Sequence, residues 1–519
     1  MSLRFSSLAL GLAVIGSPGW ADVTAAEVWA SWQSSLAAGG DGVELTTQAV
    51  REDGDNLIVE GAELTFTPEL EEEDGEVRFT ISIGDILFDG RPDGTVAVTM
   101  EDMIPITVGG IADTGEPFAA RFAMALDGTE IIASGTPDAL RQVSTSPALT
   151  LTLEEYTPAE DINSIELTLS LENLAQESLR EVGDPDRTKF SSSAASLSAR
   201  FAADIEDDGS FSLSYASSDY SVAGAIALPP EADSDTEASD ILANDAYGVR
   251  YETSTAAGFV SLAFDDSTLG GDVDFDGASG TVDISLGAAN QSFSLEKGAV
   301  TARSVTDGVD FALRTDQVPV PVDINLGGAA LSFTSPLSPR DEESDVQIGL
   351  EIRELAVDDF LWNLFDPGEV LPRDPASIII DLVGQGRWLT DIFDETALAT
   401  LGPDDLPGIL SSAKIEALEI SALGAGVEGE GSVSFDYTDL ETFDGLPAPD
   451  GALSATISGV SGLIDNLVML GLLPEEQALG ARFMLGVFTT PVPDADDTVT
   501  TELSVLPDGQ VFANGQRIR

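Results

Sequence analysis

The chain has 519 residues, with 92 Asp and Glu against 22 Lys and Arg, so its formal net charge at pH 7 is −70. It contains neither histidine nor cysteine, which excludes an imidazole base, a thiolate nucleophile and the Cys/His sites of zinc, iron–sulfur or haem proteins. A polyanion also repels nucleic acid. We therefore expect a non-enzymatic protein without a cofactor or a nucleic-acid partner, stabilised without disulfides.

Residues 1–21 predict a secretory signal peptide. Arg4 supplies a positive start, Leu8–Ile15 is a short apolar run, and Gly19 and Ala21 are small residues before Asp22. The run is shorter than the roughly 20 apolar residues that span a bilayer, and no later segment predicts a transmembrane helix. We expect an exported protein, periplasmic or, as the alternative, extracellular.

A helix is expected at the start of the mature chain, followed by a β domain over residues 22–228. Thr24 and Glu27 form a capping box, and Val28, Trp29, Trp32 and Leu36 share one side of the helix that follows. After this helix the apolar pattern changes to a period of two, with Asp-Gly pairs between the runs, which predicts antiparallel strands joined by tight turns. Residues 174–182 predict a short helix, and residues 196–217 predict a hairpin.

Residues 229–246 are acidic and poor in apolar side chains, which predicts a linker or loop and a domain boundary. Strands resume over residues 247–345. Residues 346–519 predict an α+β part, with a short helix over 358–365, a mixed helical zone that ends near residue 411, and a helix pair over 461–470 and 474–488 before a final hairpin. The fold class expected is therefore mainly β with packed helices (α+β), built on a meandering, strongly twisted antiparallel sheet.

Several turns and helix starts form a recognisable set. They are the helix at 25–36 and the segments around Trp362, Phe365-Asp-Pro367 and Pro372–Pro375, together with residues 445–451, 471–477 and 508–517. In these segments the chain resembles a bacterial exported family known as domain of unknown function 2125. The resemblance implies an exported, β-rich fold and carries over no catalytic residue.

Four aspartates have the spacing of a calcium-binding loop: Asp272, Asp274, Asp276 and Asp283. Calcium needs several oxygens that converge, and this spacing supplies them. However, Val273 and Phe275 alternate with the acids as in a half-buried strand, and the preceding residues predict a strand rather than a helix. A hairpin is therefore our main interpretation, and a calcium site is the alternative.

Two further motifs match parts of catalytic signatures. Asp113-Thr-Gly115 matches an aspartic-protease triplet, but that chemistry needs a second carboxylate and no second triplet occurs. Ser411 and Lys414 have the Ser-x-x-Lys spacing of penicillin-recognising enzymes, without the companion motifs. We expect Lys414 to pair with a carboxylate, and we expect Trp29, Trp32, Trp362 and Trp388 to lie in apolar, helical surroundings.

Two functions remain open on the sequence. The first is a cell-envelope scaffold or binding module, whose partner is an unknown envelope protein. The second is a periplasmic carrier of lipid or another amphiphile, bound in a groove lined by β-strands and helices.

Overall fold

The computed structural model describes residues 23–37, 42–68, 76–111, 117–157, 162–205, 209–229, 244–265, 278–318, 320–392, 395–402, 405–443 and 445–519. Strands account for 66% of the residues and helices for 11%, and neighbouring strands pair antiparallel, so the mainly β fold class with antiparallel sheet is confirmed. The expected signal peptide, the Asp113–Gly115 triplet and three of the four calcium-loop aspartates lie outside the described residues.

The chain divides into two compact units. Unit 1 comprises Met1–Asn290 and Arg314–Pro319, and unit 2 comprises Gln291–Leu313 and Val320–Arg519. Strands β16 (Ala289–Glu296) and β18 (Val309–Thr315) lie at this division. The sequence predicts a boundary over residues 229–246. The strands before and after this stretch, β12 (Gly209–Leu228) and β13 (Gly248–Thr255), both belong to unit 1 and pair with each other.

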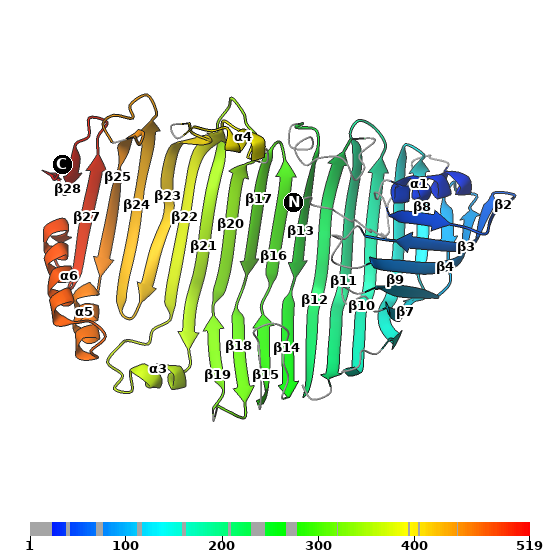
Figure 1. Ribbon diagram of the computed structural model, residues 1–519, viewed down its shortest axis with the longest axis horizontal. Helices are drawn as coiled ribbons and strands as arrows, with labels where there is room; N and C mark the ends of the chain where they lie inside the picture. Colours follow the sequence, from blue (N-terminus) through cyan, green and yellow to red (C-terminus); the bar gives the residue numbers. More distant parts are fainter. Residues whose placement is uncertain are drawn as a thin grey trace. The chain divides into compact units, whose positions relative to one another are not determined.

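Unit 1 begins with helix α1 and continues as a sheet (Figure 1). Its elements are α1 (Ala25–Ala37), β1 (Val43–Thr46), β2 (Ala49–Asp53), β3 (Asn56–Phe66), β4 (Glu76–Gly90), β5 (Val96–Thr99), β6 (Met103–Ile111), β7 (Pro117–Asp127), β8 (Glu130–Thr136), β9 (Ala139–Tyr156), β10 (Ile162–Glu181), β11 (Asp186–Ile205), β12 (Gly209–Leu228), β13 (Gly248–Thr255), β14 (Ala257–Asp265) and β15 (Ser279–Leu286). From β9 to β12 each strand pairs antiparallel with the next one in the chain.

The core of unit 1 lies between α1 and the first strands. The expected capping box is confirmed, since the Glu27 carboxylate accepts from the Thr24 amide at 2.8 Å and the Glu27 amide donates to the Thr24 hydroxyl at 3.3 Å. Val28 and Trp29 are buried against Val59 and Phe88, and the Trp29 ring meets the Phe88 ring edge-on at 5.8 Å. Trp32 packs on the same core.

Unit 2 is an antiparallel sheet with short helices at its margins (Figure 1). Its elements are β17 (Ala299–Thr306), β19 (Val322–Leu326), β20 (Gly328–Pro336), β21 (Ser344–Val357), α3 (Asp359–Phe365), β22 (Ala376–Trp388), α4 (Glu395–Ala399), β23 (Gly408–Ala422), β24 (Ala425–Asp436), β25 (Ala448–Ser458), α5 (Val460–Met469), α6 (Glu475–Phe488), β26 (Thr490–Pro491), β27 (Thr498–Val505), β28 (Val511–Ala513) and β29 (Gln516–Arg517). The expected short helix over 358–365, the C-terminal helix pair and the final hairpin are confirmed.

The short helix expected over residues 174–182 and the helical surroundings expected for Trp388 are wrong. Residues 174–181 form the second half of strand β10, where they pair with β9 on one side and with β11 on the other. Their Leu, Ala, Gln and Glu residues favour a helix locally, but two hydrogen-bonded neighbouring strands outweigh that weak propensity. The mixed helical zone expected to end near residue 411 holds one short helix, α4, between the end of β22 and the start of β23. Trp388 lies at the end of β22 rather than in a helix.

Candidate functional site

One face of the unit 2 sheet is apolar from β20 to β27. Residues paired directly across antiparallel strands share a face of the sheet. One row of such pairs comprises Ile352, Ile378, Ile420, Val427, Ile457 and Val499. A second row comprises Leu331, Leu350, Ile380 and Leu418. A third comprises Phe333, Ile348, Leu382, Ile415, Gly431, Leu453 and Leu503. We call these three rows the unit 2 apolar face.

The unit 2 apolar face is open to solvent over β20, β21 and β22. Its side chains Leu331, Phe333, Ile348, Leu350 and Leu382 are each between 39% and 56% exposed. They are adjacent in register, so they form a contiguous patch rather than scattered single residues. Antiparallel sheets usually cover an apolar face with a second layer, and a contiguous exposed patch marks a surface where something binds.

The opposite face of the same sheet is polar and acidic. A row of direct pairs runs from Glu351 through Ile379 to Glu419, Glu428, Thr456 and Thr500. A neighbouring row pairs Glu430 with Ser454 and Ser454 with Glu502. The sheet therefore separates an apolar surface from a carboxylate- and hydroxyl-bearing surface, as an amphipathic layer does.

Unit 1 repeats this arrangement in its long strands. Direct pairs connect Leu167, Phe201, Leu213, Leu262 and Val282 across β10, β11, β12, β14 and β15. The next row, which faces the other way, comprises Thr168, Arg200, Ser214, Ser261 and Asp283. Most of the apolar row is half-buried, and Leu213 is exposed.

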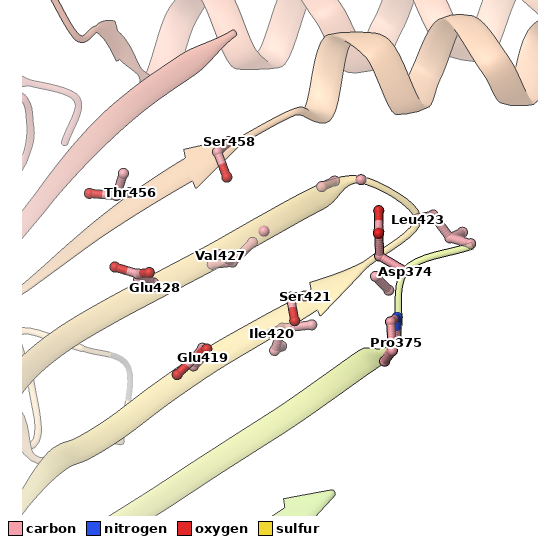
Figure 2. Close-up of a pocket in the computed structure, with 14 residues that line it drawn as sticks. Asp374, Pro375, Glu419, Ile420, Ser421, Leu423, Val427, Glu428, Thr456 and Ser458 are labelled. Carbon is pink, nitrogen blue, oxygen red and sulfur yellow. The ribbon is translucent and has the colours of Figure 1, made fainter. Parts of the chain in front are cut away.

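A hollow of about 520 Å³ lies at the turn between β23 and β24. Figure 2 shows the side chains of Glu419 and Glu428 on neighbouring strands, with Thr456 on the next strand, and with Ser458 and Asp374 near the turn. Within the described part of the chain, no three Asp or Glu side chains gather closely enough to hold a metal ion. Because calcium takes six to eight oxygen ligands, this hollow is a poor match for that ion.

Of the four calcium-loop aspartates, the structure describes only Asp283. Its carboxylate accepts from the Ser261 hydroxyl at 2.6 Å and pairs with the Arg314 guanidinium at 3.1 Å. It lies on β15, as the hairpin interpretation expects for this end of the loop.

Ser411 and Lys414 lie on strand β23, not on a helix. The register with β22 skips Ser411, which lies in a bulge between Leu410 and Ser412, and the serine and the lysine have separate partners. The Ser411 hydroxyl donates to the Gln385 carbonyl at 3.1 Å, and the Lys414 ammonium pairs with Glu416 at 2.5 Å. The expectation that Lys414 pairs with a carboxylate is confirmed.

Helices α5 and α6 border the unit 2 apolar face at β27. Thr501 pairs with Ala455 and precedes Leu503 by two residues, so its side chain lies on the apolar face. Its hydroxyl donates to the carbonyl of Phe488, the last residue of α6, at 2.8 Å. The C-terminal end of α6 is thereby anchored on the apolar side of the sheet.

Among the described residues, no helix has both the length and the apolar composition needed to cross a bilayer. Comparisons with protein-family models, with curated proteins and with solved structures find no match. The resemblance to domain of unknown function 2125 therefore stays a prediction from the sequence.

Proposed function

We propose that this chain is an exported cell-envelope protein that binds amphiphiles, with their acyl chains lying on the unit 2 apolar face. The observation that carries the proposal is the contiguous exposure of large aliphatic and aromatic side chains over β20, β21 and β22. Covering apolar surface is favourable by about 25 cal/mol per Å², and an acyl chain that lies flat across several strands covers such surface.

The chemistry of the face favours an amphiphile over a polar ligand. Its three rows hold aliphatic side chains, one phenylalanine and one glycine, without a charged group. The acidic residues are segregated to the opposite face, where they stay solvated. A hydrocarbon chain matches such a surface, and a headgroup that extends past the strand ends stays in water.

The test is binding of a fluorescent acyl-chain probe, below its critical micelle concentration, to the full chain. Phe333→Asn and Ile348→Asn alter two side chains that are paired directly across β20 and β21. We expect the two substitutions together to raise the Kd about tenfold or more, because each removes a large apolar contact. Binding is measured by fluorescence titration and by native mass spectrometry.

The matched control is Thr334→Asn, which introduces the same side chain at the next residue of β20, on the opposite face. It should leave the Kd unchanged. Equal losses for Phe333→Asn and Thr334→Asn, or a wild-type chain that binds no probe, would contradict the proposal and favour the scaffold function instead.

Export is proposed on the pattern of residues 1–21. In a bacterial expression host, the protein recovered from the periplasm should have a mass corresponding to a chain that begins at Asp22. Intact-mass measurement checks this expectation, and an unprocessed chain that stays in the cytoplasm would contradict it.

A further inference from the structure

Helix α6 exposes four large apolar side chains on one side. Leu479, Phe483 and Val487 recur every four residues and so share one side of the helix, with Met484 beside them. These four side chains are between 51% and 70% exposed. The side of α6 that packs against the protein carries Ala478, which is 1% exposed, and the half-buried Leu485 and Phe488. The helix α6 therefore has a second apolar side that is open to solvent, whereas the large apolar side chains Val28 and Trp29 of α1 are buried.

The turn between α5 and α6 extends the same apolar surface. Met469 at the end of α5 is 71% exposed and Leu472 in the turn is 58% exposed. We call these six residues the α5–α6 apolar surface: Met469, Leu472, Leu479, Phe483, Met484 and Val487. All six lie on α5, α6 or the turn that joins the two helices, and all are more than half exposed, which is the kind of exposure that marks an interaction site.

The charged residues around the α5–α6 apolar surface indicate which kind of lipid it would bind. Glu475 and Glu476 stand in the first turn of α6, and Arg482 is ion-paired with Asp465. The helix pair therefore lacks the row of basic side chains by which amphipathic helices bind anionic lipids. The chain as a whole carries a formal charge of −70, which an anionic bilayer repels. Carboxylates beside an apolar surface instead complement the ammonium groups of zwitterionic phospholipids.

The α5–α6 apolar surface also adjoins the surface proposed to bind acyl chains. The Thr501 hydroxyl, which lies on the unit 2 apolar face, donates to the Phe488 carbonyl at the end of α6. Val487, on the exposed side of the helix, is the residue before Phe488, so the exposed side ends one residue from this contact with the sheet.

We propose that α5 and α6 dock on a zwitterionic phospholipid bilayer, with the α5–α6 apolar surface inserted at the boundary between headgroups and acyl chains. This inference rests on the proposed function, because docking places the margin of the unit 2 apolar face beside the lipid that it would take up. Insertion removes six large apolar side chains from water, and the flanking carboxylates stay at the level of the ammonium groups.

The experiment is flotation of the full chain with vesicles of phosphatidylcholine and phosphatidylethanolamine. The wild-type chain should float with the vesicles, and Leu479→Glu and Phe483→Glu should each reduce vesicle affinity about tenfold or more. Leu446→Glu is the matched control, because Leu446 is 67% exposed but lies in the segment before β25. It should float like the wild-type chain. Replacing part of the phosphatidylcholine with phosphatidylglycerol should weaken binding, most strongly at low salt.

Three outcomes would overturn the docking proposal: a wild-type chain that does not float, an equal loss for Leu446→Glu, or tighter binding to the anionic vesicles. A change from dimer to monomer in Phe483→Glu, without a loss of flotation, would assign the surface to a second copy of the chain instead. Binding of the monomeric acyl-chain probe is measured without vesicles. A Leu479→Glu variant that still binds this probe but no longer floats separates docking from the proposed function.

Discussion

Asp366, the residue after helix α3, has a fully buried carboxyl group that binds the backbone of the segment that follows. It accepts from the amide of Val370 at 2.9 Å and from the amide of Leu371 at 2.8 Å. The hydrogen bond from Val370 is the largest cause that holds the pKa of Asp366 below its ordinary value of 3.8, and the one from Leu371 and the Arg373 guanidinium lower the pKa further. Burial acts in the opposite direction and raises the pKa. The carboxylate therefore satisfies backbone donors that would otherwise be unpaired.

Asp366→Asn should destabilise the protein, because an amide group offers one acceptor oxygen where two are used. A carboxyl whose pKa is lowered by folding stabilises the folded state above its ordinary pKa, and this contribution disappears as the pH falls through the lower folded value. The urea midpoint of Asp366→Asn should thus lie below that of the wild-type chain at pH 7, and the difference should shrink below pH 3.8.

The exposed Asp374→Asn serves as the control for this change of charge. An equal effect of the two substitutions, or a difference that persists unchanged in acid, would show that the two amide hydrogen bonds do not account for the stability of the segment.

At the level of single elements, the start of α5 depends on two residues outside the helix, its N-cap Gly459 and the more distant Asp497. Its N-cap, Gly459, has a φ of 69° and no side chain that could cap the helix. Asp497, from the segment before β27, accepts instead from the amides of Ser461 and Gly462 at 3.2 and 3.0 Å. Asp497→Ala should therefore cost about 1 kcal/mol of unfolding free energy, which is typical of a lost cap. Chemical denaturation measures this cost, and a variant as stable as the wild-type chain would contradict the assignment.

Gly459 and Gly471 form a matched pair for a second prediction. Their φ angles are 69° and 72°, so a side chain is strained at either position. A Cβ at Gly459 would lie 2.0 Å from the Gly424 carbonyl oxygen, whereas a Cβ at Gly471 would have open space. Gly471→Ala should cost about 1–2 kcal/mol, the cost of the conformation alone, and Gly459→Ala should cost clearly more. Equal losses of unfolding free energy for the two substitutions, measured in urea, would contradict the close approach of Gly459 to Gly424.

Helix and strand positions were largely predictable from the sequence, but the faces they expose were not. The capping box at Thr24 and the proline before α6 mark helix starts by chemistry that is local to the chain. The spacing of Leu479, Phe483 and Val487 predicts a helix with one apolar face. The same spacing is expected whether that face is buried or exposed to solvent. Likewise, the alternation of Ile348, Leu350 and Ile352 predicts a strand but not whether a second layer covers it.

At the scale of the whole molecule, the net charge of −70 should make stability depend on salt. Repulsion among the carboxylates acts over about 30 Å at 0.01 M ionic strength and about 10 Å at 0.1 M. We therefore expect the thermal midpoint to rise as NaCl is added, and then to level off.

Calorimetry in NaCl and in CaCl₂ at equal ionic strength tests this expectation. If screening alone acts, the thermal midpoints in the two salts should be equal. A thermal midpoint that does not change between low and high NaCl would contradict the predicted effect of screening. An additional rise that is specific to calcium would support the alternative interpretation of the loop from Asp272 to Asp283.

The pairing of each long strand with its neighbour in sequence bears on how the protein acquires its structure. Strands β10, β11 and β12 hold 20 residues each, and each pairs antiparallel with the next one in the chain. Contacts between segments adjacent in the chain need little loop closure, so this part of the sheet can grow strand by strand as the polypeptide emerges. A newly added strand then serves as the template for the next, and the growing edge stays unpaired only until the following segment arrives.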